Sequence, residues 1–223
     1  MLEYVTDIIN DPVYNCGTWI FSILIMGYGL QIIQDVIRGG TCLPKILPKK
    51  VIILGLKGTI INVFYLLIQI GILVLIASAL NFPTFDLEDF FLEYHKTLML
   101  IYHHDAVSFM IFTISGIIVT YVTTFFMELS LARLADGENL RHLFNFAQIK
   151  HEIDIIGWKK YTIAYTKIIL VIIVFSHINK FIDPYYGFNV IIGTFSSFFA
   201  FIVEYRGMGR IYKVYTDNKD KIT

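Results

Sequence analysis

Residues 27–45, GYGLQIIQDVIRGGTCLPK, mark the point where an apolar helix changes character. The run 12–34 contains no charged residue, whereas Asp35 and Arg38 follow it closely. Gly39-Gly40 then interrupt the pattern, because glycine readily adopts backbone conformations that a helix excludes. We predict that a membrane-spanning helix leaves the apolar phase here, becomes amphipathic, and turns along the membrane surface.

The composition of the whole chain is typical of a membrane protein. Of 223 residues, 56% are hydrophobic and 16% are charged, which is more apolar than soluble domains usually are. The 18 basic and 18 acidic residues cancel, so no global charge favours nucleic acid as a partner. Two cysteines cannot build a disulfide framework.

Long uncharged runs predict the spans. A helix needs about 20 apolar residues to cross hydrocarbon, and several runs reach that length. We predict an all-α, polytopic membrane protein, residues 1–223 forming a single transmembrane domain with about five transmembrane helices. The predicted spans are about 14–35, 58–80, 106–127, 161–182 and 185–204.

Basic residues predict the orientation, because they are enriched in cytoplasmic loops. Five lysines and arginines fall in each of three segments, namely 36–57, 128–160 and 205–223. The opposite side receives only Lys96 and Lys180. We therefore expect the protein in the cell membrane, with its N-terminus outside and its C-terminus in the cytoplasm.

Two further segments are predicted to be helical without crossing. Residues 138–156 repeat apolar side chains at helical spacing and carry polar ones on the other face, Glu152 among them. This pattern favours an amphipathic helix on the inner membrane surface over a coiled-coil partner, since the repeat lasts under three heptads. Residues 86–105 either lie on the outer surface or extend the third span.

Small and polar residues inside the spans suggest how the helices pack. Gly116, Thr120 and Thr124 recur every fourth residue, as do Gly193 and Ser197, and such faces let helix backbones approach closely. Candidate polar contacts, either between helices or to a substrate, are Asn62, Gln69, Lys167 and Asn189.

Catalytic and metal-binding patterns are weak. His103-His104-Asp105 is the most suggestive group, but neither histidine has a ligand-type residue at the helical spacing of three or four that metal sites use. No serine sits in a nucleophile-elbow pattern, and no phosphate-binding glycine pattern occurs. We expect neither an enzyme nor a cofactor.

Short motifs along most of the chain resemble an archaeal family of multi-pass membrane proteins, domain-of-unknown-function family 4013. The residues that carry this resemblance at the first turn are Gly27, Tyr28, Gly39, Gly40, Leu43 and Pro44. Gly55, Gly157-Trp158 and Arg206-Gly207 extend it along the chain. The resemblance implies an integral membrane protein of archaeal source and implies no activity.

Two functions remain open on the sequence. The leading expectation is a non-enzymatic membrane scaffold or assembly component, with the lipid bilayer and a second copy or another membrane protein as partners. The alternative is a transporter or lipid-handling permease for a neutral or amphiphilic substrate. A continuous polar cavity would favour transport, whereas close packing through small residues would favour a scaffold.

Overall fold

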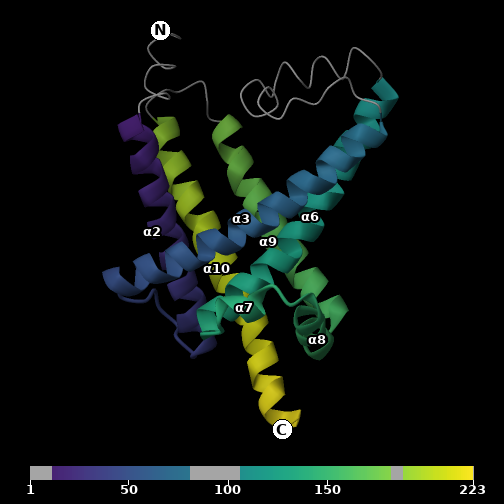
Figure 1. The fold of residues 1–223 in the computed structure, drawn as a ribbon. Helices are drawn as coiled ribbons and strands as arrows, with labels where there is room; N and C mark the ends of the chain where they lie inside the picture. Colours follow the sequence, from purple (N-terminus) through teal and green to yellow (C-terminus); the bar gives the residue numbers. More distant parts are fainter. Residues whose placement is uncertain (1–11, 81–105, 182–187, 223) are drawn as a thin grey trace. The chain divides into compact units, whose positions relative to one another are not determined.

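The computed structural model describes residues 12–80, 106–181 and 188–222, and every regular element in these ranges is a helix (Figure 1). The helices are α2 (Pro12–Ile37), α3 (Pro48–Ala79), α6 (Ala106–Asp136), α7 (Leu140–Leu143), α8 (Phe146–Ile156), α9 (Trp158–Phe181) and α10 (Phe188–Ile222). Three of them are long and apolar enough to cross a membrane: α2 from Gly17, α3 and α6. The predicted all-α class is confirmed at this level.

Several helices are longer than the apolar runs that predicted them. Helix α3 begins at Pro48, ten residues before the predicted span, and α10 continues to Ile222. Proline is favoured in the first turn of a helix, where its missing N–H costs no hydrogen bond. The lysines that follow Pro48 are good helix formers, so charge ends the apolar run without ending the helix.

Glycines in the left-handed conformation end α2 and α6. Gly39 has a φ of 90°, and the N–H groups of Gly39 and Gly40 donate to the carbonyls of Val36 and Asp35. Gly137 has a φ of 110° and closes α6 in the same way. Such paired bonds satisfy the last carbonyls of a helix. The predicted break at Gly39-Gly40 is therefore observed.

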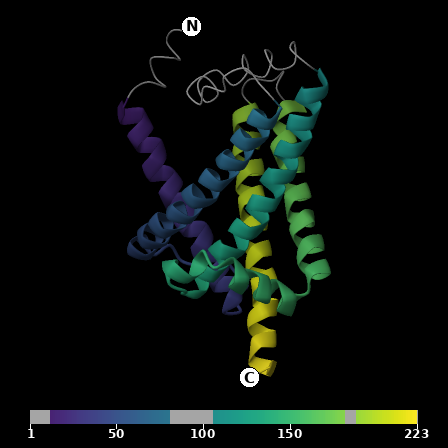
Figure 2. The ribbon, with the colours of Figure 1, turned by 45° about the vertical axis from the view of Figure 1, so that its right-hand side comes forward.

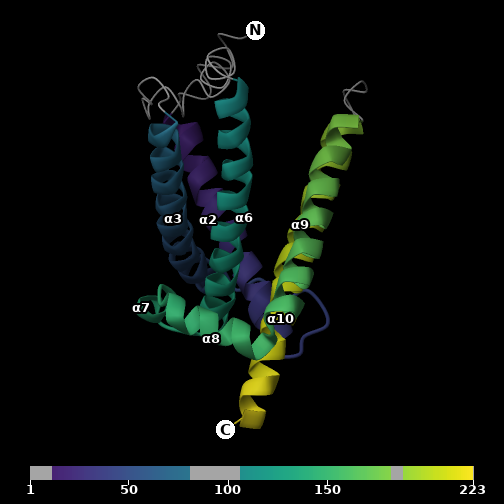
Figure 3. The same ribbon diagram turned by 90° about the vertical axis from the view of Figure 1, so that its right-hand side faces the viewer.

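The chain divides into two compact units, residues 1–61 with 128–223, and residues 62–127. In the first unit α2 and α10 run side by side (Figure 1), as do α9 and α10 (Figure 3). Its core is apolar and unusually rich in tyrosine, with Tyr161, Tyr165 and Tyr212 almost fully buried. The second unit contains the remaining parts of α3 and α6.

The predicted single helix 138–156 is instead two helices. Asn145 interrupts it, because its Oδ1 accepts hydrogen bonds from the N–H groups of Ala147 and Gln148 and so caps α8. Helix α8 packs against α9 and α10 (Figure 2), and Ile149 and Ile153 are fully buried. Protein, rather than lipid, covers its apolar face. The predicted helix at 86–105 lies outside the described residues.

Candidate functional site

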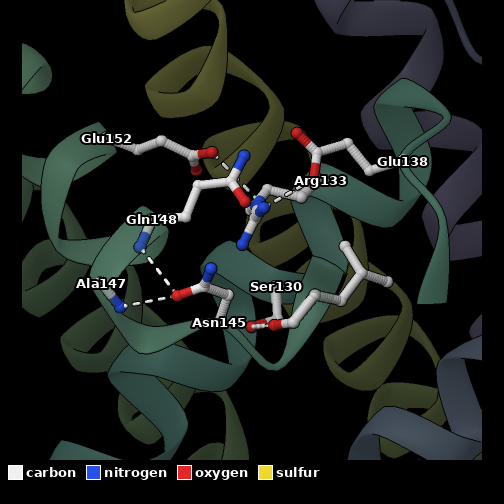
Figure 4. A network of polar contacts seen from close by, with 8 residues as sticks. Ser130, Arg133, Glu138, Asn145, Ala147, Gln148 and Glu152 are labelled. Atoms are coloured by element: carbon white, nitrogen blue, oxygen red, sulfur yellow. Dashed lines mark hydrogen bonds and ion pairs between the residues drawn. The ribbon is translucent and has the colours of Figure 1, made fainter. Parts of the chain in front are cut away.

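A buried arginine connects the end of α6 to α8 (Figure 4). Arg133 is fully buried in the last turn of α6. Its Nη2 lies 2.6 Å from Oε2 of Glu138, and its Nε lies 3.1 Å from Oε1 of Glu152. The Glu152 side chain is also fully buried. Buried charges persist in proteins when they are paired in this way.

Backbone contacts hold this ion pair in place (Figure 4). The hydroxyl of Ser130, one turn before Arg133, donates to the carbonyl of Leu143 at 3.2 Å. Asn145 then caps α8 and fixes where its first turn begins. With α8 beginning here, Glu152 lies on the buried side of the helix together with Ile149, three residues before it, and Ile153, one residue after it.

The electrostatics of the pair are set mainly by burial. Burial raises the pKa of Glu152 to about 7, since the guanidinium of Arg133 opposes this shift only in part and the carboxylate of Glu138 adds to it. Burial also raises the pKa of Tyr212, and the charge of Glu152 raises it further. Tyr212 is therefore a neutral phenol at physiological pH. The ion pair of Arg133 with Glu152 connects α6 to α8.

Two glycines bring α2 and the start of α3 into backbone contact. A Cβ added at Gly27 would collide with the carbonyl oxygen of Val51, and one at Gly55 would collide with that of Ile23. Glycine is required at both positions because any side chain would force the helices apart. This close contact at Gly27 and Gly55 was not predicted from the sequence, which placed small-residue packing in the third and fifth predicted spans.

An apolar cavity of about 1030 Å³ lies between α2, α10 and the start of α3. Its volume is at the upper end of the range of about 300–1,000 Å³ that is usual for ligand pockets. The rings of Tyr28 and Phe201 stack at 6.4 Å between centroids and form part of the wall. The lining residues are Phe21, Leu24, Ile25, Tyr28, Ile46, Pro48, Val51, Gly193, Thr194, Ser197, Phe198 and Phe201.

The motif residues at the end of α2 and just after it lie around this cavity and along the loop that follows α2. The hydroxyl of Tyr28 donates to the carbonyl of Pro44 at 3.3 Å, which folds the loop back onto the helix. Leu43, in contrast, is exposed. Gly27 is at the α2–α3 contact, and Gly39 and Gly40 form the helix end described above.

The predicted small-residue faces have different surroundings. A Cβ at Gly116 would be 3.8 Å from Leu73, an ordinary contact, and Thr124 bonds to carbonyls of its own helix. Gly193 and Ser197 are among the residues that line the apolar cavity. Their predicted role in helix packing stays a prediction.

The four candidate polar residues are divided between the two units, Asn62 and Gln69 in the second and Lys167 and Asn189 in the first. Gln69 donates to the hydroxyl of Thr120 at 2.9 Å, a bond between α3 and α6 within the second unit. The Oδ1 of Asn62 is buried without a hydrogen-bond partner among the described residues. Lys167 is exposed on α9, and Asn189 lies in the first turn of α10.

Sequence reasoning missed the pairing of Arg133 with Glu152. From the sequence, Arg133 was only one of the basic residues of a predicted cytoplasmic segment, and Glu152 was predicted on the polar face of the 138–156 helix. A signal was present, since Glu152 stands between Ile149 and Ile153. His103-His104-Asp105 lies outside the described residues, and within the described ranges no group of three metal-ligating side chains occurs.

Comparison with known proteins gives a family and no activity. No curated protein and no solved structure matches the chain. The model of a family described as "Protein of unknown function (DUF4013)" matches residues 13–183, which is most of the chain and includes the first turn, α3, α6 and the Arg133–Glu152 pair. The resemblance carried by the short motifs is confirmed, and the chain belongs to the DUF4013 family of proteins of unknown function.

Proposed function

We propose that this DUF4013 protein is a non-enzymatic, multi-pass membrane component that acts as a scaffold or assembly partner. Helices α2, α3 and α6 have the length and composition of membrane spans. We place α9 and the first part of α10 in the membrane as well, which gives five spans with the N-terminus outside and the C-terminus in the cytoplasm. The distribution of basic residues supports this orientation.

The observation that carries the proposal is that polar side chains, the buried Arg133 above all, pair with groups of the protein itself. Arg133, the buried cation of α6, has carboxylate partners in Glu138 and Glu152. Gln69 bonds to Thr120 on the neighbouring helix. Groups used in this way fasten helices to one another, whereas a transport path or a catalytic site needs polar groups directed at a substrate.

Exposed apolar side chains supply the surface that such a component requires. Trp19, Phe21, Leu67 and Leu75 are each more than 60% exposed, a density of large apolar groups that a water-soluble protein would bury. In the proposed topology these side chains face lipid, a second copy of the chain or another membrane protein.

The proposal is tested by the assembly state of the protein in membranes. The full chain, extracted in mild detergent and exchanged into lipid nanodiscs, should run as an assembly of fixed stoichiometry, with itself or with one other membrane protein, in native mass spectrometry. The scaffold proposal would be contradicted by a protein that is strictly monomeric in nanodiscs and that cross-links to no stoichiometric protein partner in native membranes.

The apolar cavity favours a second candidate, a lipid-handling permease for an amphiphilic substrate. The cavity wall is almost entirely apolar and is formed by exposed residues such as Phe21 and Phe198, so an acyl chain could enter it. Movement of a fluorescent phospholipid between leaflets of proteoliposomes, faster than in protein-free vesicles, would favour this candidate. An unchanged rate would favour the scaffold.

A further inference from the structure

One face of α2 is apolar in its first half and polar in its second. Phe21, Leu24, Ile25 and Tyr28 line the apolar cavity, and Gln31, Gln34, Asp35 and Arg38 line a second, polar pocket. Each of these positions has another of the set three or four residues away, so together they form one stripe along the helix. At ~1.5 Å per residue the stripe is about 25 Å long, close to half the roughly 40–45 Å thickness of a whole bilayer.

The polar pocket has a volume of about 250 Å³ and lies where α2 ends. The segment after α2 contributes to both, since Pro44, Lys45 and Leu47 line the pocket while Ile46 and Pro48 line the apolar cavity. This segment is fixed at both sides. Tyr28 donates to the carbonyl of Pro44, and Nη2 of Arg206 in α10 donates to the carbonyl of Thr41 at 2.9 Å.

The charges around the pocket favour an anion. Arg38, Lys45 and Lys50 line it, and Asp35 is the carboxylate among its lining residues. The three cations come from the end of α2, from the segment after it and from the first turn of α3. Cations from three elements that converge on one small pocket are an arrangement suited to a phosphate group.

Two buried glutamines are also among the residues that line this pocket. Gln31 is 4% exposed and Gln34 is 8% exposed. Their Nε2 atoms donate to the carbonyls of Lys45 and Ala135, each at 2.7 Å, and a carbonyl can only accept. The orientation of both amides is thereby fixed. Each Oε1 is itself buried and has no hydrogen-bond partner among the described residues, so the charged side chains, and not these oxygens, are what the pocket offers to a ligand.

We propose that this stripe binds an anionic glycerophospholipid. The phosphate lies among Arg38, Lys45 and Lys50, and an acyl chain occupies the apolar cavity. In the proposed topology the headgroup lies at the cytoplasmic surface. The inference goes beyond the proposed scaffold function, because a lipid can be held by a monomer or by an assembly.

The test is a lipid titration of the delipidated full chain in detergent, followed by native mass spectrometry. Phosphatidylglycerol should bind in one-to-one stoichiometry and more tightly than phosphatidylcholine of the same chain length, which carries no net negative charge. Free glycerol phosphate should compete poorly, because it lacks the chain that fills the cavity.

Matched variants separate the pocket from general surface charge. Arg38→Gln with Lys50→Gln removes two pocket cations and should weaken phosphatidylglycerol binding about 25-fold, since each basic residue near an anionic lipid is worth about fivefold. Lys49→Gln with Lys159→Gln removes two exposed cations that do not line the pocket and should leave binding within about twofold of the parent protein.

A second pair of variants tests the apolar half. Ser197→Trp fills the cavity and should weaken binding of the long-chain lipid, whereas Phe195→Trp, on the same helix but not lining the cavity, should not. Equal losses in the two double variants would overturn the proposal. So would equal binding of phosphatidylcholine, or competition by glycerol phosphate at the concentration at which the lipid itself binds.

Discussion

At the scale of single residues, the feature that most shapes the protein is a charge buried where apolar packing alone would have sufficed. Arg133 and Glu152 are both fully buried and lie 3.1 Å apart at the nearest atoms. A buried ion pair contributes little net stability compared with apolar residues of the same size, yet removing one partner is strongly destabilising. The pair therefore specifies how α6 and α8 meet more than it strengthens the fold.

The raised pKa of Glu152 predicts a pH-dependent stability. Its pKa is about 7 in the folded protein and about 4.3 in an unfolded chain. Between these values the folded state holds a proton that the unfolded state has released, so the free energy of unfolding falls as pH rises from about 4.3 to about 7. Above that range this contribution is constant.

Unfolding of the protein in detergent, followed at a series of pH values, checks this prediction. Glu152→Gln should remove the fall in stability across that range, because glutamine does not titrate. The idea fails if the variant and the parent protein lose stability in parallel.

Removing the arginine should cost more than removing a surface charge. Arg133→Met leaves the Glu152 carboxylate buried without its cation, and at a pH above 7 we expect a loss of about 3 kcal/mol in the free energy of unfolding. Arg133→Met with Glu152→Met should recover most of it. Arg210→Met removes an exposed arginine of α10 and should change stability by less than about 0.5 kcal/mol. A double variant as unstable as the single one would show that the ion pair is not the cause.

At the scale of elements, the helices themselves could be predicted, and their ends and partners could not. The uncharged runs located α2, α3 and α6, since a long apolar run is the signal of a helix that crosses a membrane. Charge, however, reports where the apolar phase ends. Lys49 and Lys50 do not stop a helix, so helix α3 begins at Pro48, before the predicted membrane span at 58–80.

The predicted surface helix at 138–156 shows that a local sequence pattern also does not determine what a helix packs against. The apolar spacing of Ile149 and Ile153 correctly located a buried face, but periodicity does not say whether lipid or protein covers it. The structure covers it with α9 and α10, and Asn145 divides the segment in two. The buried position of Glu152 depends on Arg133, which lies 19 residues earlier, and a local pattern does not contain that partner.

Helix α8 should be released by a charge on its buried face. Ile153→Asp places an unpaired carboxylate where the parent side chain is 0% exposed, so amide hydrogen exchange in 146–156 should increase strongly. Phe146→Asp, at a position that is 46% exposed, should leave exchange almost unchanged. Protection that persists in Ile153→Asp would mean that contacts other than the α9–α10 packing hold the helix.

The contact between α2 and α3 should tolerate no added methyl group. Gly27→Ala and Gly55→Ala each place a Cβ against a backbone carbonyl of the facing helix, so both should lower the unfolding temperature. Gly71→Ala is the matched control in α3, since a Cβ there has open space around it and alanine favours helix by about 1 kcal/mol. If Gly27→Ala, Gly55→Ala and Gly71→Ala all changed the unfolding temperature equally, the close approach of α2 and α3 would be contradicted.

At the scale of the whole molecule, the sequence predicted an apolar helical protein but not the site on α2. The alternation of apolar and polar residues along 21–38 is visible in the sequence. The pocket beside its polar half exists because the segment after α2 folds back, and that depends on the long-range contacts of Tyr28 and Arg206. Contacts between residues far apart in sequence are the part that a single sequence does not supply.

The central claim is that the chain crosses the membrane five times with its N-terminus outside, and cysteine accessibility tests it most directly. In a background with Cys16→Ser and Cys42→Ser, single variants Phe90→Cys and Lys219→Cys are treated on intact cells with a membrane-impermeant thiol reagent. With five spans and an outside N-terminus, position 90 is labelled on intact cells and position 219 is labelled only after the cells are opened. Equal labelling of both positions on intact cells, or labelling of 219 alone, would contradict it.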